Sequence, residues 1–421
     1  MRATCSLSRN APLLAGLLMF IAAAAIRPAA TADQPDDRTA SAGTAATATP
    51  ASPWARWKYG PPTDPGFFPL AVWLQTPSNA AKYQAAGINV FVGLWDGPTE
   101  EQLAALKKVG MKVICAQNAV GLKHRDDPTI IGWMHGDEPD NAQEKKGGGY
   151  GPPILPTTIQ AEYDAIKKQD PDRPVMENLG QSVAWDRYIG RGVRSNHPED
   201  YREYLKGADF ASFDIYPVAG ETKPEVKDKL WLVPYGVQRL IDWSDGKKPI
   251  WCCIECTTIG NVNRAPTPRE TRAEIWMAII QGARGIVYFC HQFKPTFVEA
   301  ELLHEPEMLK QIAATNAEIQ HLAPVINRPA LPAEACKITL DDPTQVVAAT
   351  ARKMKGAIYI FAAIERPGKT KATYQIAGAP QHGQVEVIGE NRTIKLTDGR
   401  FEDSFAGWDV HLYCIAPPKP D

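Results

Sequence analysis

The sequence lacks a long hydrophobic run, a block of basic residues and a phosphate-binding GxxxxGK loop. Its longest apolar stretch, residues 11–26, has 16 residues, whereas a membrane-spanning helix needs about 20. Without clustered lysine and arginine, neither nucleic acid nor a membrane surface is an expected partner. What remains is the ordinary composition of a globular protein, with 44% hydrophobic and 22% charged residues.

The first 32 residues have the pattern of a secretory signal. Arg2 and Arg9 give a basic start, residues 11–26 are apolar, and 30–32 offer small residues for cleavage. Cleavage leaves 43 basic and 48 acidic residues, a net charge of −5. We therefore expect a secreted or periplasmic protein, with an uncleaved anchor as the alternative. Residues 33–64, rich in Ala, Thr and Pro, are expected to form a flexible linker and lead-in.

Cysteine is too scarce for a disulfide scaffold, because seven residues survive signal cleavage and an odd number cannot all pair. Cys252, Cys253 and Cys256 raise the alternative of a zinc or redox site, but no second Cys or His pair lies nearby. We interpret them as buried thiols. Whether Cys336 and Cys414 pair stays open. No metal or other cofactor is expected, because the histidines are scattered and no HxH pair follows the first strand.

Residues 65–327 alternate eight apolar segments with helical segments, and the third apolar segment is followed by an unusually short connection that carries His124, Arg125 and Asp126. Apolar runs bounded by Gly and Pro are typical of buried strands, and Thr before a periodic segment is typical of a helix cap. Ser78, Thr99, Thr157 and Thr267 are the predicted helix starts. The eight units predict a (β/α)8 TIM barrel. The predicted strands are 67–74, 88–94, 111–117, 130–138, 173–179, 209–216, 249–257 and 285–291.

Residues 328–421 lose the helical pattern and show short strands separated by turns. This spacing predicts a small antiparallel β-sandwich domain after the barrel. The predicted strands are 337–340, 346–350, 357–363, 371–376, 385–388, 393–396 and 410–415.

Two glutamates stand at the carboxyl ends of predicted barrel strands, where barrel enzymes place catalytic groups. Side-chain alternation puts Ile130, Gly132, Met134, Gly136 and Glu138 on one face, so Glu138 would end the fourth strand pointing inward. A solvated acidic loop is the alternative.

Glu255 ends the seventh strand, which is otherwise apolar, on the face shared by Trp251 and Cys253. Burying a carboxylate there is costly unless it is paired or partly solvated. A structural ion pair is the alternative. Glycoside hydrolysis needs two opposed carboxyl groups. One protonates the leaving oxygen, and the other either attacks the anomeric carbon or activates a water molecule.

With this arrangement the chain resembles clan A of the glycoside hydrolases. Residues 132–139, Gly-Trp-Met-His-Gly-Asp-Glu-Pro, are similar to the acid/base motif of that clan, usually Asn-Glu-Pro. The resemblance implies Glu138 as acid/base, Glu255 as nucleophile and a retaining mechanism. Asp137 replaces the Asn that contacts the sugar, and a neighbouring carboxylate would raise the pKa of Glu138.

Other strand ends supply expected sugar contacts. The clan resemblance implies that the hydroxyl group of Tyr216, in the segment 213–217, contacts the nucleophile; a core tyrosine is the alternative. Aromatic rings suit the apolar faces of sugars, and amides suit hydroxyl groups. The expected substrate-binding residues are Asp137, Tyr216, His291, Trp95, Asn118, Asn178, Tyr288 and Gln292. His135 faces away and is expected to be structural.

The sequence therefore predicts a secreted, retaining glycoside hydrolase acting on an oligosaccharide or polysaccharide, with a β-linked glycan favoured. One alternative is a non-catalytic carbohydrate-binding or scaffold protein on a barrel that has lost activity. A metal-dependent barrel hydrolase is the other, and it would need converging His and Asp ligands. Sugar specificity and exo or endo action do not follow from the sequence.

Overall fold

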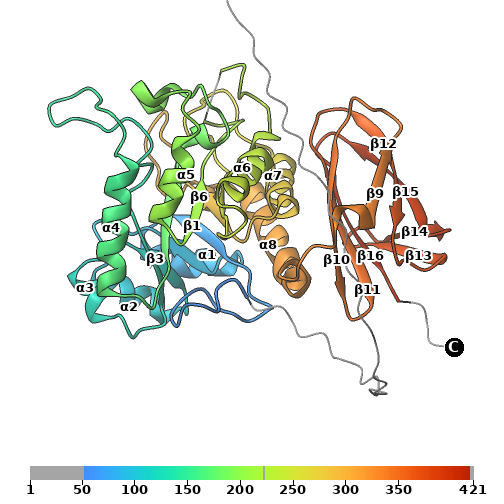
Figure 1. Cartoon of the computed structure of the whole chain (residues 1–421), viewed down its shortest axis with the longest axis horizontal. Coiled ribbons are helices and arrows are strands. Elements are labelled where there is room, and N and C mark those ends of the chain that lie inside the picture. Colours follow the sequence, from blue (N-terminus) through green and yellow to red (C-terminus); the bar gives the residue numbers. More distant parts are fainter. Residues whose placement is uncertain (1–51, 221–222, 418–421) are drawn as a thin grey trace, which may run out of the picture. The chain divides into compact units, whose positions relative to one another are not determined.

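The computed structural model describes residues 52–220 and 223–417. They form a barrel of parallel strands with surrounding helices and a second group of antiparallel strands (Figure 1). The predicted signal, residues 1–32, lies outside the described residues, as does the predicted linker up to residue 51. Within the described ranges, no helix combines the length and the apolar character that crossing a membrane requires.

Eight parallel strands form the barrel, as predicted, and each is followed by a helix, of which the helix after the third strand was not predicted. The sheet order is β6-β5-β4-β3-β2-β1-β8-β7, and the bridge between Ala211 and Ile250 joins its two ends. The strands are β1 (Leu70–Trp73), β2 (Val90–Val92), β3 (Lys112–Cys115), β4 (Ile130–Met134), β5 (Val175–Leu179), β6 (Phe210–Phe213), β7 (Cys252–Glu255) and β8 (Ile286–Phe289). The helices are α1 (Ala80–Ala85), α2 (Glu100–Lys108), α3 (Ala119–Lys123), α4 (Pro156–Gln169), α5 (Asp200–Tyr204), α6 (Leu232–Trp243), α7 (Pro268–Gln281) and α8 (Pro306–Ile326).

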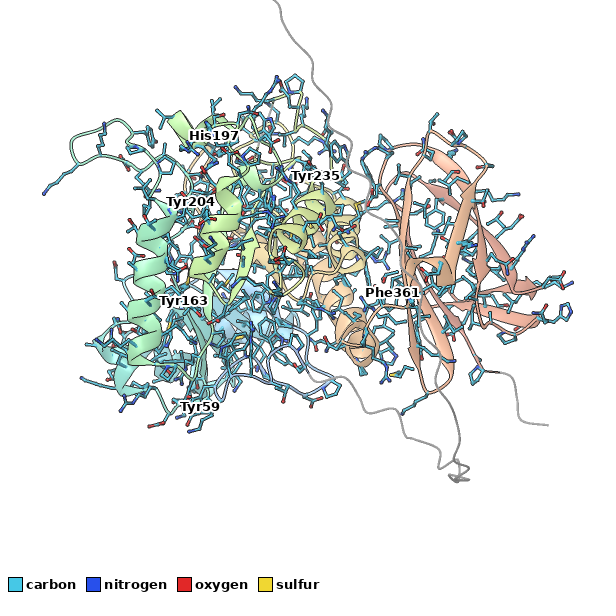
Figure 2. The ribbon with its side chains drawn as sticks, in the orientation of Figure 1. Tyr59, Tyr163, His197, Tyr204, Tyr235 and Phe361 are labelled. Carbon is cyan, nitrogen blue, oxygen red and sulfur yellow. The ribbon has the colours of Figure 1, made fainter. Side chains whose placement is uncertain are left out.

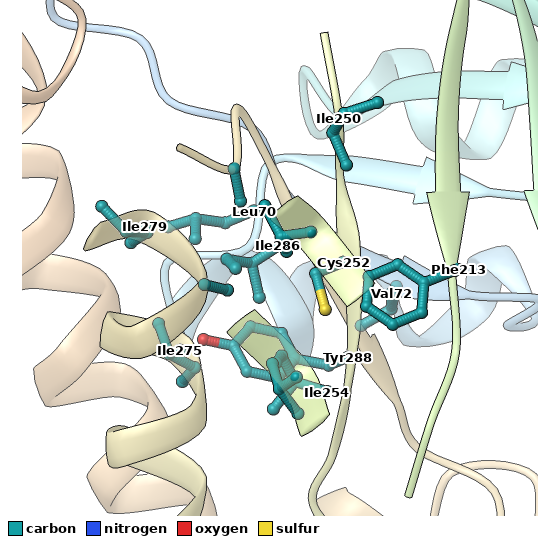
Figure 3. Close-up of a cluster of buried hydrophobic side chains, with 14 of the residues drawn as sticks. Leu70, Val72, Phe213, Ile250, Cys252, Ile254, Ile275, Ile279, Ile286 and Tyr288 are labelled. Atoms are coloured by element: carbon teal, nitrogen blue, oxygen red, sulfur yellow. The ribbon is translucent and has the colours of Figure 1, made fainter. Parts of the chain in front are cut away.

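Strand residues divide between two apolar cores. One fills the barrel, with side chains such as Trp251, Cys253 and Val287, and the other lies between the strands and the helices. Figure 3 shows the second core, where Cys252 and Ile254 of β7 meet Ile275 of α7. This alternation along each strand decides which side chains can reach the barrel interior and the pocket above it.

Strand β4 departs from the predicted alternation. Ile131 packs in the barrel and Ile130 and Trp133 pack against the helices, so the prediction that Ile130 shares the inward face of Met134 was wrong. The pairing of β4 with β3 shifts by one residue at Gly132, as at a β-bulge. A Cβ atom at Gly132 would lie 3.3 Å from the Pro174 oxygen. Because of the bulge, the side chains that follow it point to the opposite face from the one that strict alternation predicts.

The described part of the lead-in packs on the barrel, in contrast to the predicted flexible linker. Trp54 is buried in the barrel core, with its ring 5.3 Å from Phe210 and 6.1 Å from Trp251. Both partners lie at the amino end of their strands. Trp54 thus covers the end of the barrel opposite the site described below.

Two of the four predicted helix starts are confirmed as caps. Thr99 and Thr267 each accept a hydrogen bond from the third helical residue in a capping box. Ser78 is not a cap, because it lies within a short 3-10 helix, Pro77–Asn79, and Asn79 precedes α1. Thr157 is not a cap, because α4 begins one residue earlier with Pro156 in its first turn, a position that suits the fixed φ of proline.

The second group of strands is antiparallel, as predicted, with order β10-β11-β16-β13-β14-β15-β12-β9 and a separate apolar core. Seven strands match the prediction, and Arg400–Ala406 (β15) was missed because Asp403 interrupts its apolar side between Phe401 and Phe405. Phe361 of this sheet, labelled in Figure 2, packs on Trp276 of α7, with 5.3 Å between ring centres. Cys336 and Cys414 are unpaired in strands that are not neighbours. The strands are β9 (Cys336–Leu340), β10 (Val347–Met354), β11 (Ala357–Ile364), β12 (Lys369–Ile376), β13 (His382–Val387), β14 (Arg392–Thr397), β15 (Arg400–Ala406) and β16 (Val410–Ile415).

Candidate active site

A pocket of about 270 Å³ opens at the carboxyl ends of the barrel strands. Three acidic side chains, several aromatic rings and no basic residue line it. The lining residues are Trp73, Asp137, Glu138, Asn178, Gln181, Tyr188, Asp214, Tyr216, Gly220, Ile259, Phe289 and Phe293. Concave sites with converging polar groups at this end of a barrel are where catalysis is expected.

Glu138 lies in this pocket, four residues after the end of β4. Its backbone has φ +43°, a left-handed conformation that is costly for a residue other than glycine. The Glu138 backbone N–H donates to the Asn178 backbone oxygen at 3.2 Å, and the Asn141 backbone N–H donates to the Glu138 backbone oxygen at 3.0 Å. The two bonds hold the strained residue in place and aim its carboxyl group into the pocket.

The carboxyl group of Glu138 forms a side-chain hydrogen bond with that of Asp214, which directly follows β6. Burial, followed by the charges of Asp137 and Asp140, raises the pKa of Glu138 to about 8. Burial and the Glu138 charge raise the pKa of Asp214 well above its ordinary value. Two carboxyl groups in contact cannot both ionise easily, so the pair retains a proton at neutral pH.

Asp137 stands at the pocket entrance, and its Oδ1 accepts a hydrogen bond from Asn178 at 2.9 Å. Asn178 in turn accepts a bond from the Ser212 hydroxyl at 2.5 Å, which fixes its amide orientation. Desolvation of the Asp137 carboxyl group raises its pKa to about 6. At pH 7 Asp137 is therefore ionised while the neighbouring Glu138 is protonated.

A buried polar network braces the loop that carries these acids. Asp140 accepts hydrogen bonds from the Gly180 N–H at 2.9 Å and the Tyr201 hydroxyl at 2.7 Å. Arg191 donates to the Asp140 backbone oxygen at 3.0 Å. The network ties the β4 loop to the β5 loop and to α5, so the acids rest on a rigid base.

The structure does not bring Glu255 into this pocket. Glu255 is fully buried, and its two oxygens accept hydrogen bonds from the N–H groups of Val218 at 2.8 Å and Ala219 at 2.5 Å. Its carboxyl group also forms a hydrogen bond with Glu274 of α7. Burial raises the pKa of Glu255 to about 7. In this arrangement Glu255 holds the segment after β6, and its side chain is directed toward α7.

Besides Asp137 and Asn178, three further predicted sugar-binding residues lie in or beside the pocket. Tyr216 lines it with its ring 5.1 Å from Phe289. His291 is buried, its Nε2 is 3.0 Å from the Leu74 oxygen, and burial lowers its pKa. Trp95, 41% exposed, stacks on His291 with 5.9 Å between ring centres. His135, buried with Nε2 2.8 Å from the Gly207 oxygen, is structural as expected.

Three other predicted contacts point elsewhere, and these predictions are corrected. Asn118 caps α3, which the sequence reading missed, by accepting a bond from the Gly121 N–H at 2.8 Å. Tyr288 faces the helices, as Figure 3 shows, and donates to Asn316 at 2.6 Å. Gln292 accepts a bond from Thr258 at 2.8 Å and joins the β7 and β8 loops.

The sequence reading did not assign three residues that shape the site: Asp214, Asn141 and Gly180. The Asn141 side chain acts on the Glu138 carboxyl group and opposes the rise in its pKa. At Gly180 a Cβ atom would lie 2.9 Å from Glu138 Oε1 and 2.8 Å from Asn141 Oδ1, so only glycine leaves room for them. The available signal for Asp214 was an acidic residue directly after an apolar strand, as for Glu138.

Comparison with known proteins points to one class of enzyme. Residues 154–322 match the sequence model of glycoside hydrolase family 42, described as β-galactosidase. The predicted similarity to barrel glycoside hydrolases is confirmed over this range, which includes Asp214 and Glu255 but not Glu138. No curated protein matches the sequence.

Solved structures with a similar course of the chain include three carbohydrate-active proteins. An AmyP variant in complex with maltotriose has 9% identity and a TM-score of 0.49, covering 84% of this chain and 98% of its own. A family 30 endoxylanase from Clostridium papyrosolvens C71 has 10% identity and a TM-score of 0.45, covering 83% and 96%. An endo-β-1,4-mannanase from Thermotoga petrophila has 12% identity and a TM-score of 0.43, covering 81% and 91%.

Proposed function

We propose that the chain hydrolyses glycosidic bonds in the pocket at the end of the barrel, with Glu138 as the proton donor. The observation that carries the proposal is the Glu138–Asp214 pair, two adjacent carboxyl groups in one acidic pocket whose pKa values are both raised. The family 42 match over residues 154–322 supports the reaction class.

Glu138 suits the role of general acid because its pKa of about 8 keeps it protonated at neutral pH. The leaving alcohol of a glycoside is a poor leaving group until its oxygen accepts a proton. Glu138 gives that proton to the glycosidic oxygen as the bond to the anomeric carbon breaks. Asn178 and Asp137 hold the entrance side of the same pocket in a fixed orientation.

For the second carboxyl group we assign Asp214, because it already lies in the pocket beside Glu138. A sugar entering between them would break their hydrogen bond, leaving the proton on Glu138 and the charge on Asp214. Retention needs the carboxyl groups about 5–5.5 Å apart and inversion about 6.5–9.5 Å. Two hydrogen-bonded carboxyl groups have to move less to reach the retaining distance than to reach the inverting one. The pair therefore favours retention, with Asp214 attacking the anomeric carbon.

The sequence-based assignment of Glu255 as the nucleophile stays a prediction with a specific structural requirement. Glu255 would have to give up its bonds from Val218 and Ala219 and turn into the pocket. Azide rescue distinguishes the two carboxyl groups. This small anion replaces a missing nucleophile, so it yields a glycosyl azide only in the variant that lacks the nucleophilic carboxyl group.

A β-linked glycan is the proposed substrate class, supported by the β-galactosidase description of the matching family. Wild type, Glu138→Gln and the control Glu162→Gln, which changes a half-exposed glutamate of α4, are to be compared on nitrophenyl glycosides and soluble polysaccharides. We expect hydrolysis by wild type and the control, and a loss of about 10²–10⁴-fold for Glu138→Gln. Binding without turnover by the wild type would favour the non-catalytic alternative.

Export through residues 1–32 completes the proposal, because a polysaccharide substrate lies outside the cytoplasm. Amino-terminal sequencing of the protein recovered from culture medium or periplasm tests it. A mature terminus near residue 33 is expected, and an intact Met1 in the exported fraction contradicts cleavage.

A further inference from the structure

Aromatic side chains are concentrated beside the pocket. Five large aromatic side chains of the described surface are more than a third exposed, and three of the five touch one another. Trp95, Phe293 and Phe297, called the aromatic shelf below, are 41%, 49% and 53% exposed. Exposed apolar residues scattered singly need no explanation, whereas a contiguous group marks a binding surface.

The shelf continues the wall of the pocket outward. Phe289 and Phe293 both line the pocket, with 6.1 Å between their ring centres. Phe297 lies 5.7 Å from Phe293, and Trp95 lies 6.5 Å from Phe297. The rings therefore form an uninterrupted path from Tyr216 and the catalytic acids to the loops after β8 and β2.

The shelf is also held in a fixed orientation. The Trp95 indole N–H donates to Glu299 at 3.1 Å, and Glu299 accepts another bond from the Thr76 hydroxyl at 2.8 Å. The Trp95 ring stacks on His291, which is buried and hydrogen-bonded to the Leu74 backbone oxygen. Rigid aromatic rings lose little conformational entropy when a ligand covers them.

We propose that the aromatic shelf binds further sugar units of a neutral glycan chain whose scissile bond lies in the pocket. This inference rests on the proposed function and extends it, because it predicts an oligosaccharide or polysaccharide substrate in preference to a single sugar with a small aglycone. Sugar rings offer apolar C–H faces that pack on aromatic rings. The pocket is lined by acids and no base, which disfavours an anionic glycan.

The test separates the shelf from catalysis by measuring binding in an inactive background. Glu138→Gln protein is run in native gels that contain soluble neutral β-linked glucan, galactan, xylan or mannan. Phe297→Ala and Trp95→Ala are each added, with Tyr235→Ala as a matched control. Tyr235, labelled in Figure 2, is 43% exposed on α6, outside the shelf and the pocket.

At least one of these polysaccharides is expected to retard the protein, and each shelf substitution should weaken that binding about tenfold. The Tyr235→Ala control should bind as before, and Phe297→Tyr, which keeps a ring, should restore most of the affinity. Equal retardation of shelf and control variants, or no retardation by any neutral polysaccharide, overturns the proposal.

Kinetics distinguish this inference from the proposed function. In otherwise wild-type protein, Phe297→Ala should lower kcat/KM on the retarding polysaccharide about tenfold while changing hydrolysis of a nitrophenyl monosaccharide less than about threefold. Equal losses on both substrates contradict the shelf. If wild type hydrolyses neither substrate but shelf variants lose retardation, the shelf stands and the hydrolase proposal fails.

Discussion

The carboxyl groups of Glu138 and Asp214 are hydrogen-bonded to each other at the ends of strands β4 and β6. The pairing brings two acids together that lie far apart in the sequence, in the pocket where the reaction is placed. It implies that the pair titrates as a unit, with apparent pKa values that belong to both groups.

The pH dependence of activity should report the proton on Glu138. With a pKa of about 8, kcat/KM is expected to fall as the pH rises past about 8, because the acid is then lost. The charge of Asp137 is the largest electrostatic cause of the raised value. Asp137→Asn removes it and should move the basic limb down by about one pH unit. The exposed Asp164→Asn serves as control, and an unmoved or raised limb in Asp137→Asn contradicts the assignment.

Gly180→Ala should reduce activity without removing any functional group. The added Cβ atom would stand within 3 Å of both Glu138 Oε1 and Asn141 Oδ1, so the carboxyl group must shift. A displacement of about 1 Å costs roughly 10²-fold in rate. Rates of Gly180→Ala and of Gly136→Ala, where a Cβ meets nothing within 4 Å, give the comparison. Full activity in Gly180→Ala would mean that Glu138 tolerates displacement.

Glu255 and Asp214 should differ in what their loss does to the protein. Glu255→Ala leaves the Val218 and Ala219 N–H groups without acceptors, so it should lower the free energy of unfolding by about 2–4 kcal/mol. Asp214→Ala should keep most of the stability and lose activity, with azide restoring turnover and yielding a glycosyl azide. Urea unfolding and product analysis check both. Azide rescue of Glu255→Ala instead would restore the sequence-based nucleophile.

Glu177 should make the fold less stable as the pH rises. It is fully buried on β5, neither carboxyl oxygen has a hydrogen-bond partner, and burial raises its pKa well above the ordinary 4.5. The unfolded chain ionises first, so stability falls as the pH rises from 4.5 toward the folded pKa. Glu177→Gln should therefore gain about 2–3 kcal/mol at pH 7 and almost nothing at pH 4. Urea unfolding at the two pH values measures this, and a less stable variant at pH 7 contradicts it.

The barrel was predictable because each of its strands contains an apolar run, and a helical pattern follows every strand except the third, where α3 has only five residues. The capping boxes at Thr99 and Thr267 are local patterns and were found for that reason. The bulge at Gly132 was not, because it depends on how β4 pairs with β3, a relationship that no single segment contains. The strand Arg400–Ala406 was missed because Asp403 stands between Phe401 and Phe405 on its inner face, where an apolar residue is expected.

The site residues show the same distinction between local sequence patterns and contacts between distant segments. Glu138 and Tyr216 reach the pocket as predicted, and Asn178 does so as a partner of Asp137. Whether Glu255 turns to the barrel or to α7 depends on the N–H groups of the β6 loop, which alternation along β7 does not reveal. Tyr288 was assigned to the pocket because its position at a strand end was considered without the face on which it lies.

The role of Glu138 is tested most directly by the dependence of Glu138→Ala on the leaving group. An alkyl glycoside needs a proton on its leaving oxygen, whereas a dinitrophenyl glycoside departs without one. The variant should lose about 10²–10⁴-fold in kcat/KM on the first and less than about tenfold on the second. An equal loss on both substrates, or no loss on either, would contradict Glu138 as the acid of this site.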